Sequence, residues 1–144
     1  ALSFFIACGS NKSDRPGADE TDTVALVPGW EASLNDSTGQ LEMNKLEQGG
    51  PDSLTAASVI AYLNKQNPNV QLMLLKTSGD TIYVKIPDAM YLTQQMGSSG
   101  PQIFFAEAVY NLTEIPGIKY VNFDFEEGDH ASPATLNREG FKDE

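Results

Sequence analysis

The sequence has few of the residues that metal sites, disulfide-bonded folds and nucleic-acid surfaces require. It contains one cysteine and one histidine, which excludes a disulfide within the chain and the common Cys/His zinc sites. Only 9 residues are basic whereas 20 are acidic, and the formal net charge of −11 argues against nucleic acid as a partner, because nucleic-acid binding depends on clustered lysine and arginine. The apolar run at residues 1–7 is far shorter than the roughly 20 residues that span a bilayer. We therefore expect no metal ion, no other cofactor and no nucleic-acid partner.

What the chain does have is the composition of one folded domain. Hydrophobic residues make up 40% of its 144 residues and charged residues 20%, and these proportions are typical of folded soluble domains rather than of disordered chains. The length suits a single domain with a core of useful size.

The N-terminus resembles the end of a bacterial lipoprotein signal peptide. The apolar run ends in Phe5-Ile6-Ala7-Cys8, and a polar stretch that contains proline and glycine follows. The tetrapeptide is similar to a lipobox, in which a small residue precedes the cysteine, although Phe5 stands where leucine is commonest. The resemblance implies that residues 1–7 are the remnant of a signal peptide. It also implies that the thiol of Cys8 carries the lipid that anchors the chain to the membrane.

The alternative is a buried strand over residues 2–6, with Cys8 as a small core residue. Residues 8–22 favour the anchor, because a polar stretch of this kind suits a flexible tether better than a core. Residues 23–50 form an extension whose structure the pattern leaves undefined. Within it, residues 23–27 fit one extra strand.

From residue 51 the pattern sharpens, and it first predicts a helix. Asp52 or Ser53 can serve as the N-cap directly after Pro51. The helix ends near Gln66, because the following residues contain a proline. Its apolar stripe has helical spacing and consists of Ala56, Val59, Ile60 and Leu63.

An antiparallel hairpin is predicted next. Residues 70–76 and 81–86 alternate as strands do, and residues 77–80 have the composition of a tight turn. The first strand places Val70, Leu72 and Leu74 on one face, and the second places Ile82, Val84 and Ile86 on one face.

A second helix is predicted to begin at Ser99, which forms a capping box with Gln102. Its buried stripe consists of Phe105, Ala108, Val109 and Leu112. Residues 118–125 alternate as a final strand, and residues 129–144 form a polar tail that we expect to be disordered.

The predicted order over residues 51–128 is therefore helix–strand–strand–helix–strand. The two strands joined by the tight turn must be antiparallel, and the last strand, reached through a helix, is expected to be parallel to one of them. The predicted fold class is α+β, a compact sandwich of two helices on a small mixed sheet. Residues 23–27 can add one N-terminal strand.

The second helix and the strand after it resemble the closing part of the sporulation and spore germination (GerMN) domain. In that family the helix ends in a phrase like Leu-Thr-Glu-x-Pro-Gly-Val, and residues 112–118 here have the sequence Leu-Thr-Glu-Ile-Pro-Gly-Ile. The strand that ends in Pro87-Asp88-Ala89 is similar to the family's hairpin strand. The resemblance covers residues 51–128. It implies an extracytoplasmic domain, often carried by lipoproteins, without established catalytic residues and with the layout of ring-building modules.

Residues with catalytic or metal-binding chemistry follow no functional spacing. His130 lies in the polar tail and is expected to be solvated. Residues 97–100, Gly-Ser-Ser-Gly, lack the spacing of a nucleophile elbow and suit a helix start, whose free N–H groups can also hold an anion. Four acids near the end of the last strand lack EF-hand spacing, which favours a solvated edge: Asp124, Glu126, Glu127 and Asp129. We predict no catalytic residue and no metal ligand.

The candidate partner surface is the sheet face opposite the helices. Tyr83, Lys85, Tyr120 and Asn122 alternate with the apolar residues of their strands, so we expect them on the open face. Aromatic and amide groups there suit a sugar or a protein partner. They also suit ordinary cross-strand pairing, which is the more common arrangement.

The leading functional hypothesis is a lipid-anchored, extracytoplasmic protein of the bacterial cell envelope with a non-catalytic binding or assembly domain. Its expected partners are the membrane, through the lipid at Cys8, and either peptidoglycan or another envelope protein. One alternative is an envelope hydrolase, or its accessory subunit, that uses carboxylates without a recognisable motif. The other is a self-assembling structural module of the ring-building type.

Overall fold

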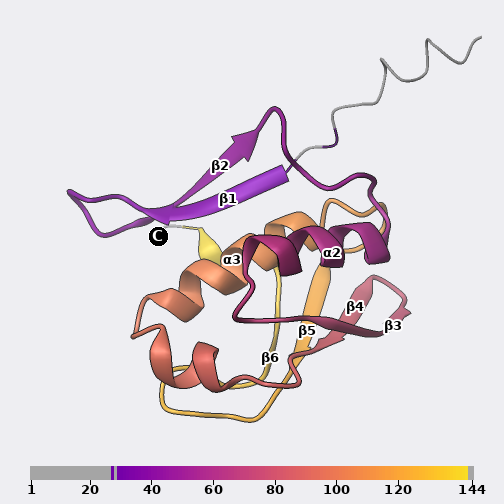
Figure 1. Ribbon diagram of the computed structural model, residues 1–144. Helices are drawn as coiled ribbons and strands as arrows, with labels where there is room; N and C mark the ends of the chain where they lie inside the picture. The colour runs from indigo at the N-terminus through magenta and orange to yellow at the C-terminus, as the bar shows by residue number, and fades with distance from the viewer. Residues whose placement is uncertain (1–26, 28, 143–144) are drawn as a thin grey trace, which may run out of the picture.

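The computed structural model describes residue 27 and residues 29–142. These residues form an α+β fold with two small sheets (Figure 1), so the predicted fold class is confirmed. One sheet is the hairpin of β1 (Gly29–Leu34) and β2 (Leu41–Leu46); the other contains, in this order, β3 (Met73–Ser78), β4 (Thr81–Lys85), β5 (Tyr120–Asp124) and β6 (Ala134–Leu136). The helices are α2 (Ala56–Gln66), the π-helix η1 (Tyr91–Gln95), α3 (Gly100–Leu112) and the 3-10 helix η2 (Arg138–Phe141).

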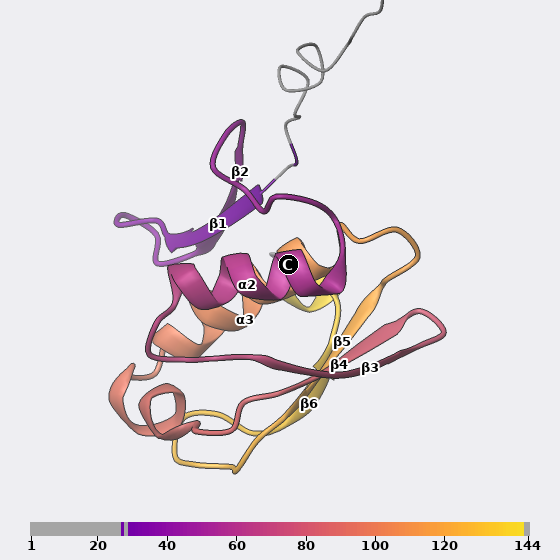
Figure 2. The same ribbon diagram turned by 45° about the vertical axis from the view of Figure 1, so that its right-hand side comes forward.

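The central unit has the predicted order of elements. α2, β3, β4, α3 and β5 follow one another; β3 is antiparallel to β4, and β4 is parallel to β5. Gly79 occupies the β3–β4 turn with a φ of 61°, a left-handed conformation that glycine adopts without steric cost. Figure 2 shows α2 and α3 together on one side of the four-stranded sheet. The predicted topology of this unit is therefore confirmed.

The start of α2 differs from the prediction. The N-cap is Thr55, whose Oγ1 accepts a hydrogen bond from the backbone N–H of Ser58 at 3.2 Å. Ser53 instead donates its hydroxyl proton to Ser58 Oγ at 2.8 Å. Asp52 and Ser53 are therefore not the cap, because the chain bends through residues 52–55 before it enters the helix. The predicted core residues Val59, Ile60 and Leu63 are buried.

The first strand of the predicted hairpin also differs. Val70 and Leu72 are buried, with 2% and 4% of their surface exposed, but they precede β3, which begins at Met73. Leu74 was expected to share their buried face, and it is 41% exposed. The physical reason is its position, because β3 forms the edge of the sheet and the β3–β4 hairpin extends past the end of α2 (Figure 2).

The β1–β2 hairpin occupies much of the extension that the sequence pattern left undefined. It packs against α3 on the side away from the four-stranded sheet (Figure 1), and Ala32, Leu41 and Ala106 form a small second core there. The strand expected at residues 23–27 lies outside the described residues, apart from Val27.

Because α3 is covered on two sides, its burial exceeds the predicted stripe. Phe105, Ala108, Val109 and Leu112 are buried as expected, and Phe104, Ala106 and Asn111 are buried as well. A helix packed between two layers is buried nearly all round. The predicted capping box at its start is wrong, since Ser99 already has helical angles (φ −95°, ψ −21°) and its side chain makes no capping hydrogen bond within the described helix.

The C-terminal tail is ordered, and the expectation of disorder is wrong for its described part. β6 pairs antiparallel with β5, with Leu136 opposite Val121 and Thr135 opposite Asn122. After β6, η2 brings Phe141 against both cores. Because the tail is mostly polar, its sequence does not indicate these few contacts, which attach the tail to the sheet and to α3.

Candidate functional site

The open face of the four-stranded sheet brings the predicted surface residues together. The parallel register of β4 and β5 sets Tyr83 beside Asn122. Lys85 on β4 and Tyr120 on β5 each lie two residues from this pair, so their side chains point to the same face of the sheet. Asn122 donates from Nδ2 to Thr135 Oγ1 at 2.7 Å. These contacts are the cross-strand pairs that an ordinary sheet makes, and partner binding at this face stays a prediction.

The neighbouring edge strand adds a feature that the sequence pattern did not indicate. Within the described residues β3 pairs with β4 alone, and all six of its residues are exposed. Met73, Leu74 and Leu75 are 51%, 41% and 48% exposed. They account for three of the five exposed large hydrophobic residues in the described part of the chain.

Such an edge offers both apolar side chains and backbone groups. An edge strand has a row of N–H and C=O groups that face away from its one partner, and these groups can pair with an added strand. The pairing of β3 with β4 shifts register between Leu74 and Lys76, which marks a bulge at Leu75. Bulges of this kind twist an edge and limit indiscriminate pairing.

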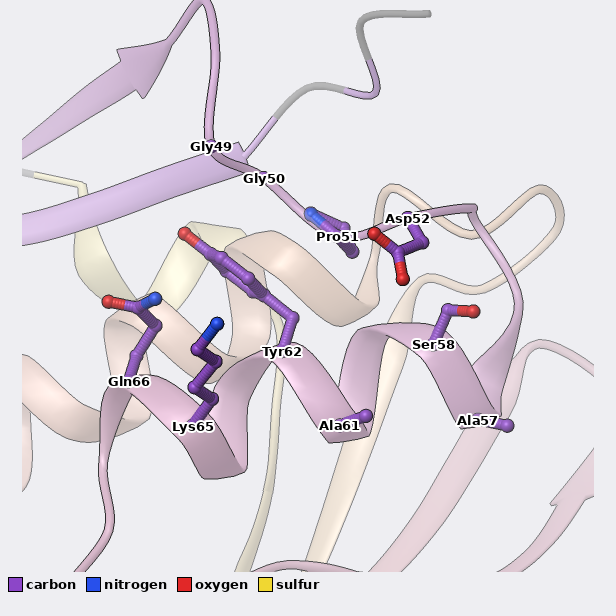
Figure 3. Close-up of a pocket in the computed structure, with 10 residues that line it drawn as sticks. All are labelled: Gly49, Gly50, Pro51, Asp52, Ala57, Ser58, Ala61, Tyr62, Lys65 and Gln66. Atoms are coloured by element: carbon purple, nitrogen blue, oxygen red, sulfur yellow. The ribbon is translucent and has the colours of Figure 1, made fainter. Parts of the chain in front are cut away.

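A groove of about 460 Å³ lies between α2 and the segment that leaves β2 (Figure 3). One residue at the rim of the groove, Gly50, must be glycine. A Cβ at this position would lie 2.7 Å from the carbonyl oxygen of Val27, so only glycine fits there without a shift of the backbone. Tyr62 rises from α2 toward this rim in Figure 3. The described residues that line the groove are Gly49, Gly50, Pro51, Asp52, Ala57, Ser58, Ala61, Tyr62, Lys65 and Gln66.

The chemistry of the groove is mixed. Asp52 is the one carboxylate among its described lining residues and Lys65 the one amine, and both are exposed. Hydrolysis of a glycosidic bond by the usual mechanism needs two carboxyl groups. The groove therefore has the character of a polar surface cleft, and its lining does not supply a catalytic carboxylate pair.

Glu107 on α3 is a partly buried carboxylate. Its oxygens accept hydrogen bonds from Asn67 Nδ2 at 3.2 Å and from the backbone N–H of Ala32 at 3.4 Å. Burial raises the pKa of Glu107, although these two hydrogen bonds act to lower it. Burial also raises the pKa of Tyr62, and the charges of Glu107 and Glu31 raise it further. Glu107 thus joins β1, α2 and α3 through its two oxygens.

A second polar cluster joins the hairpin, the end of α3 and the C-terminal segment. The guanidinium of Arg138 lies over the rings of Trp30 and Tyr110, at 5.4 Å and 4.7 Å from their centroids. Glu114 accepts hydrogen bonds from Trp30 Nε1 at 2.9 Å and from Arg138 at 3.0 Å. We call Trp30, Tyr110, Glu114 and Arg138 the aromatic clasp.

The electrostatics of the aromatic clasp follow from these contacts. Burial acts to raise the pKa of Glu114, but the hydrogen bonds from Trp30 and Arg138 and the charge of Arg138 outweigh it and lower the pKa. Buried Asn111 adds to the joint, since it exchanges hydrogen bonds with the backbone N–H and C=O of Trp30, both at 3.0 Å. Sequence reasoning missed the clasp, because 84 positions separate Trp30 from Glu114 and no local pattern connects them.

The acidic residues at the end of β5 do not form a metal site. Among the described residues, no group of three or more His, Cys, Asp or Glu side chains is placed to hold a metal ion. His130 is exposed, and its backbone N–H donates to the carbonyl of Thr93 at 3.1 Å. The predicted lipidation site, Cys8 with Phe5, Ile6 and Ala7, lies outside the described residues. Within the described part, no helix is both long and apolar enough to cross a membrane.

Comparison with known proteins gives one likeness, at the level of the fold. No protein-family model and no curated protein matches the chain. Among solved structures, the chain is similar to the tandem GerMN domains of the sporulation protein GerM from Bacillus subtilis, with a TM-score of 0.46 and 15% sequence identity. The match covers 92% of this chain and 50% of that one, so the chain spans about half the length of the structure it matches.

Proposed function

We propose that this chain is a lipid-anchored, non-catalytic binding domain of the bacterial cell envelope, and that it holds an envelope protein by adding one of that partner's extended segments to β3. Cys8 is the proposed site of the lipid. The partner's segment is the proposed fifth strand of the sheet.

The observation that carries this proposal is the exposure of β3. Three consecutive apolar side chains, Met73, Leu74 and Leu75, are about half exposed on a strand whose outer edge faces away from β4. Soluble proteins usually blunt such edges with charges, bulges, proline or a covering element; β3 has one lysine, Lys76, and the bulge at Leu75, but among the described residues no further strand pairs with its outer edge. An apolar edge of this kind is typical of a surface that a partner covers, and strand addition satisfies its backbone and its side chains together.

The carboxylates with perturbed pKa values favour binding over hydrolysis as the function. Glu107 is held by Asn67 and Ala32, and Glu114 by Trp30 and Arg138. Each carboxylate thus joins separate elements of the fold, which accounts for its burial without a reaction.

Site-specific cross-linking in the native envelope tests the proposed partner. A photo-reactive amino acid in place of Leu74 should give a discrete protein adduct, whereas the same group in place of Asn44, exposed on β2, should not. Adducts with peptidoglycan fragments instead of protein would contradict the proposed protein partner and would indicate that the domain binds the cell wall. The absence of any adduct specific to position 74 would refute binding at β3.

The anchor has a separate test. Cys8→Ala should move the precursor out of the lipid-modified membrane fraction, and Cys8→Ser serves as the near-isosteric comparison. Metabolic labelling with a fatty-acid analogue measures the modification directly. An unchanged distribution together with unchanged labelling would contradict lipidation at Cys8.

A further inference from the structure

The β3 edge differs in charge from the rest of the chain. The β3–β4 hairpin, residues 73–85, contains two lysines, Lys76 and Lys85, against one acid, Asp80, and so carries a net charge of +1, whereas the whole chain carries −11. β3 itself contains Lys76 and no acidic residue. A strand added at this edge would therefore lie beside the lysine of β3, Lys76, on an otherwise acidic protein, and exposed charges act over about 8 Å at physiological ionic strength.

The register of the sheet defines which residues an added strand would meet. Lys76 lies opposite Tyr83 and Met73 opposite Lys85 on the open face, whereas Leu74 lies opposite buried Val84 on the face toward the helices. The ammonium of Lys76 lies 4.8 Å from the ring centroid of Tyr83, which holds it over the open face. An added strand therefore has one face beside Lys76 and the other beside Leu74.

A second copy of this chain does not fit that edge well. Its own β3 would bring apolar residues to Leu74 but no negative charge to Lys76. In addition, two chains of −11 each repel one another. An extended segment that alternates acidic and apolar residues satisfies both faces, because side chains in a strand point alternately to opposite sides.

We infer that the segment added to β3 is acidic, with carboxylates beside Lys76 on the open face and apolar side chains beside Leu74 on the other. This inference rests on the proposed function, and it specifies the chemistry of the partner at the same site. Backbone hydrogen bonds to β3 supply affinity, and the carboxylates select among competing segments.

The test uses two capped peptides that alternate valine with glutamate or valine with lysine, measured against the 144-residue chain by fluorescence anisotropy at low ionic strength. We expect the glutamate peptide to bind more tightly, by about 2- to 30-fold, which is the range that one attractive against one repulsive cross-strand pair gives. Lys76→Glu should reverse the preference. Lys65→Glu makes the same charge change on the exposed face of α2 and should leave the preference unchanged.

Four further outcomes test the inference. Of two glutamate peptides, each methylated on a different set of alternate backbone amides, at least one should lose binding, since the edge that pairs with β3 is blocked in one of them; retained binding by both overturns strand addition. Equal binding of the two peptides, binding of neither, or an equal effect of Lys65→Glu and Lys76→Glu overturns the acidic segment. The cross-link from position 74 is independent of these peptides, so it shows whether the proposed function fails with the inference or survives it.

Discussion

The aromatic clasp predicts that one residue of the C-terminal segment stabilises the whole described fold. Arg138→Ala removes a guanidinium that donates to Thr113 Oγ1 at 2.8 Å, to the carbonyl of Tyr110 at 2.8 Å and to Glu114 at 3.0 Å. It also removes the cation that lies over the rings of Trp30 and Tyr110. The substitution therefore weakens the joint between the hairpin, α3 and the tail at once.

The magnitude follows from these contacts after a discount for solvent. The side chains of Arg138 and Glu114 are 33% and 21% exposed, so the ion pair and the hydrogen bonds have less than their fully buried value. With about 0.5–1 kcal/mol for each of the three polar contacts and about 0.5 kcal/mol for each ring, the expected loss is about 2.5–4 kcal/mol of the free energy of unfolding. Arg138→Lys keeps the charge but lacks the planar guanidinium, so it should lower the free energy of unfolding roughly half as much as Arg138→Ala does.

Urea denaturation monitored by tryptophan fluorescence measures this loss, because the chain contains one tryptophan and Trp30 belongs to the clasp. Lys142→Ala is the control, since Lys142 forms a pair with Glu139 at 2.7 Å that is exposed to solvent; exposed ion pairs contribute little, so this variant should unfold at nearly the urea concentration of the wild type. A loss below about 1 kcal/mol for Arg138→Ala, or a loss equal to that of the control, would show that the clasp does not join these elements.

Three further predictions concern other parts of the fold. Gly50→Ala should destabilise the chain by about 1–3 kcal/mol in the same assay, because its Cβ would lie 2.7 Å from the Val27 carbonyl oxygen; unchanged stability would mean that this rim is not closely packed. Leu63→Ala should cost about 2–5 kcal/mol and Leu74→Thr less than about 1 kcal/mol, because Leu63 is 1% and Leu74 41% exposed; equal losses would place β3 inside the core. The pKa of Glu107 is raised in the folded state. The free energy of unfolding of the wild type, relative to that of Glu107→Gln, should therefore fall as pH rises from the ordinary carboxyl pKa through the raised value. A difference between the two proteins that does not change with pH would contradict a raised pKa.

Much of the secondary structure could be predicted because its determinants are local. The stripe that contains Val59 and Leu63 predicts α2, and the alternation of Ile82 and Val84 predicts β4, because each periodicity matches the geometry of one element. The turn at Gly79 then makes β3 and β4 antiparallel. These features depend on residues at most a few positions apart, which is the range that sequence patterns report.

The candidate sites depend on contacts that the pattern does not contain. The composition of β3 predicts an apolar strand, but only its place at the sheet edge leaves Leu74 exposed and available to a partner. In the same way, the polar tail gives no local sign that Arg138 lies over the rings of Trp30 and Tyr110.

For α2, β4, α3 and β5 the sequence by itself determined the type of element and its apolar face, since both follow from the spacing of side chains along the backbone. The tertiary structure decided which of those faces are covered. The hairpin buries the far side of α3, whereas the edge of β3 faces away from its one described partner. Coverage depends on elements that are distant in sequence, so the same type of apolar residue lies in the core in one place and on the exposed surface in another.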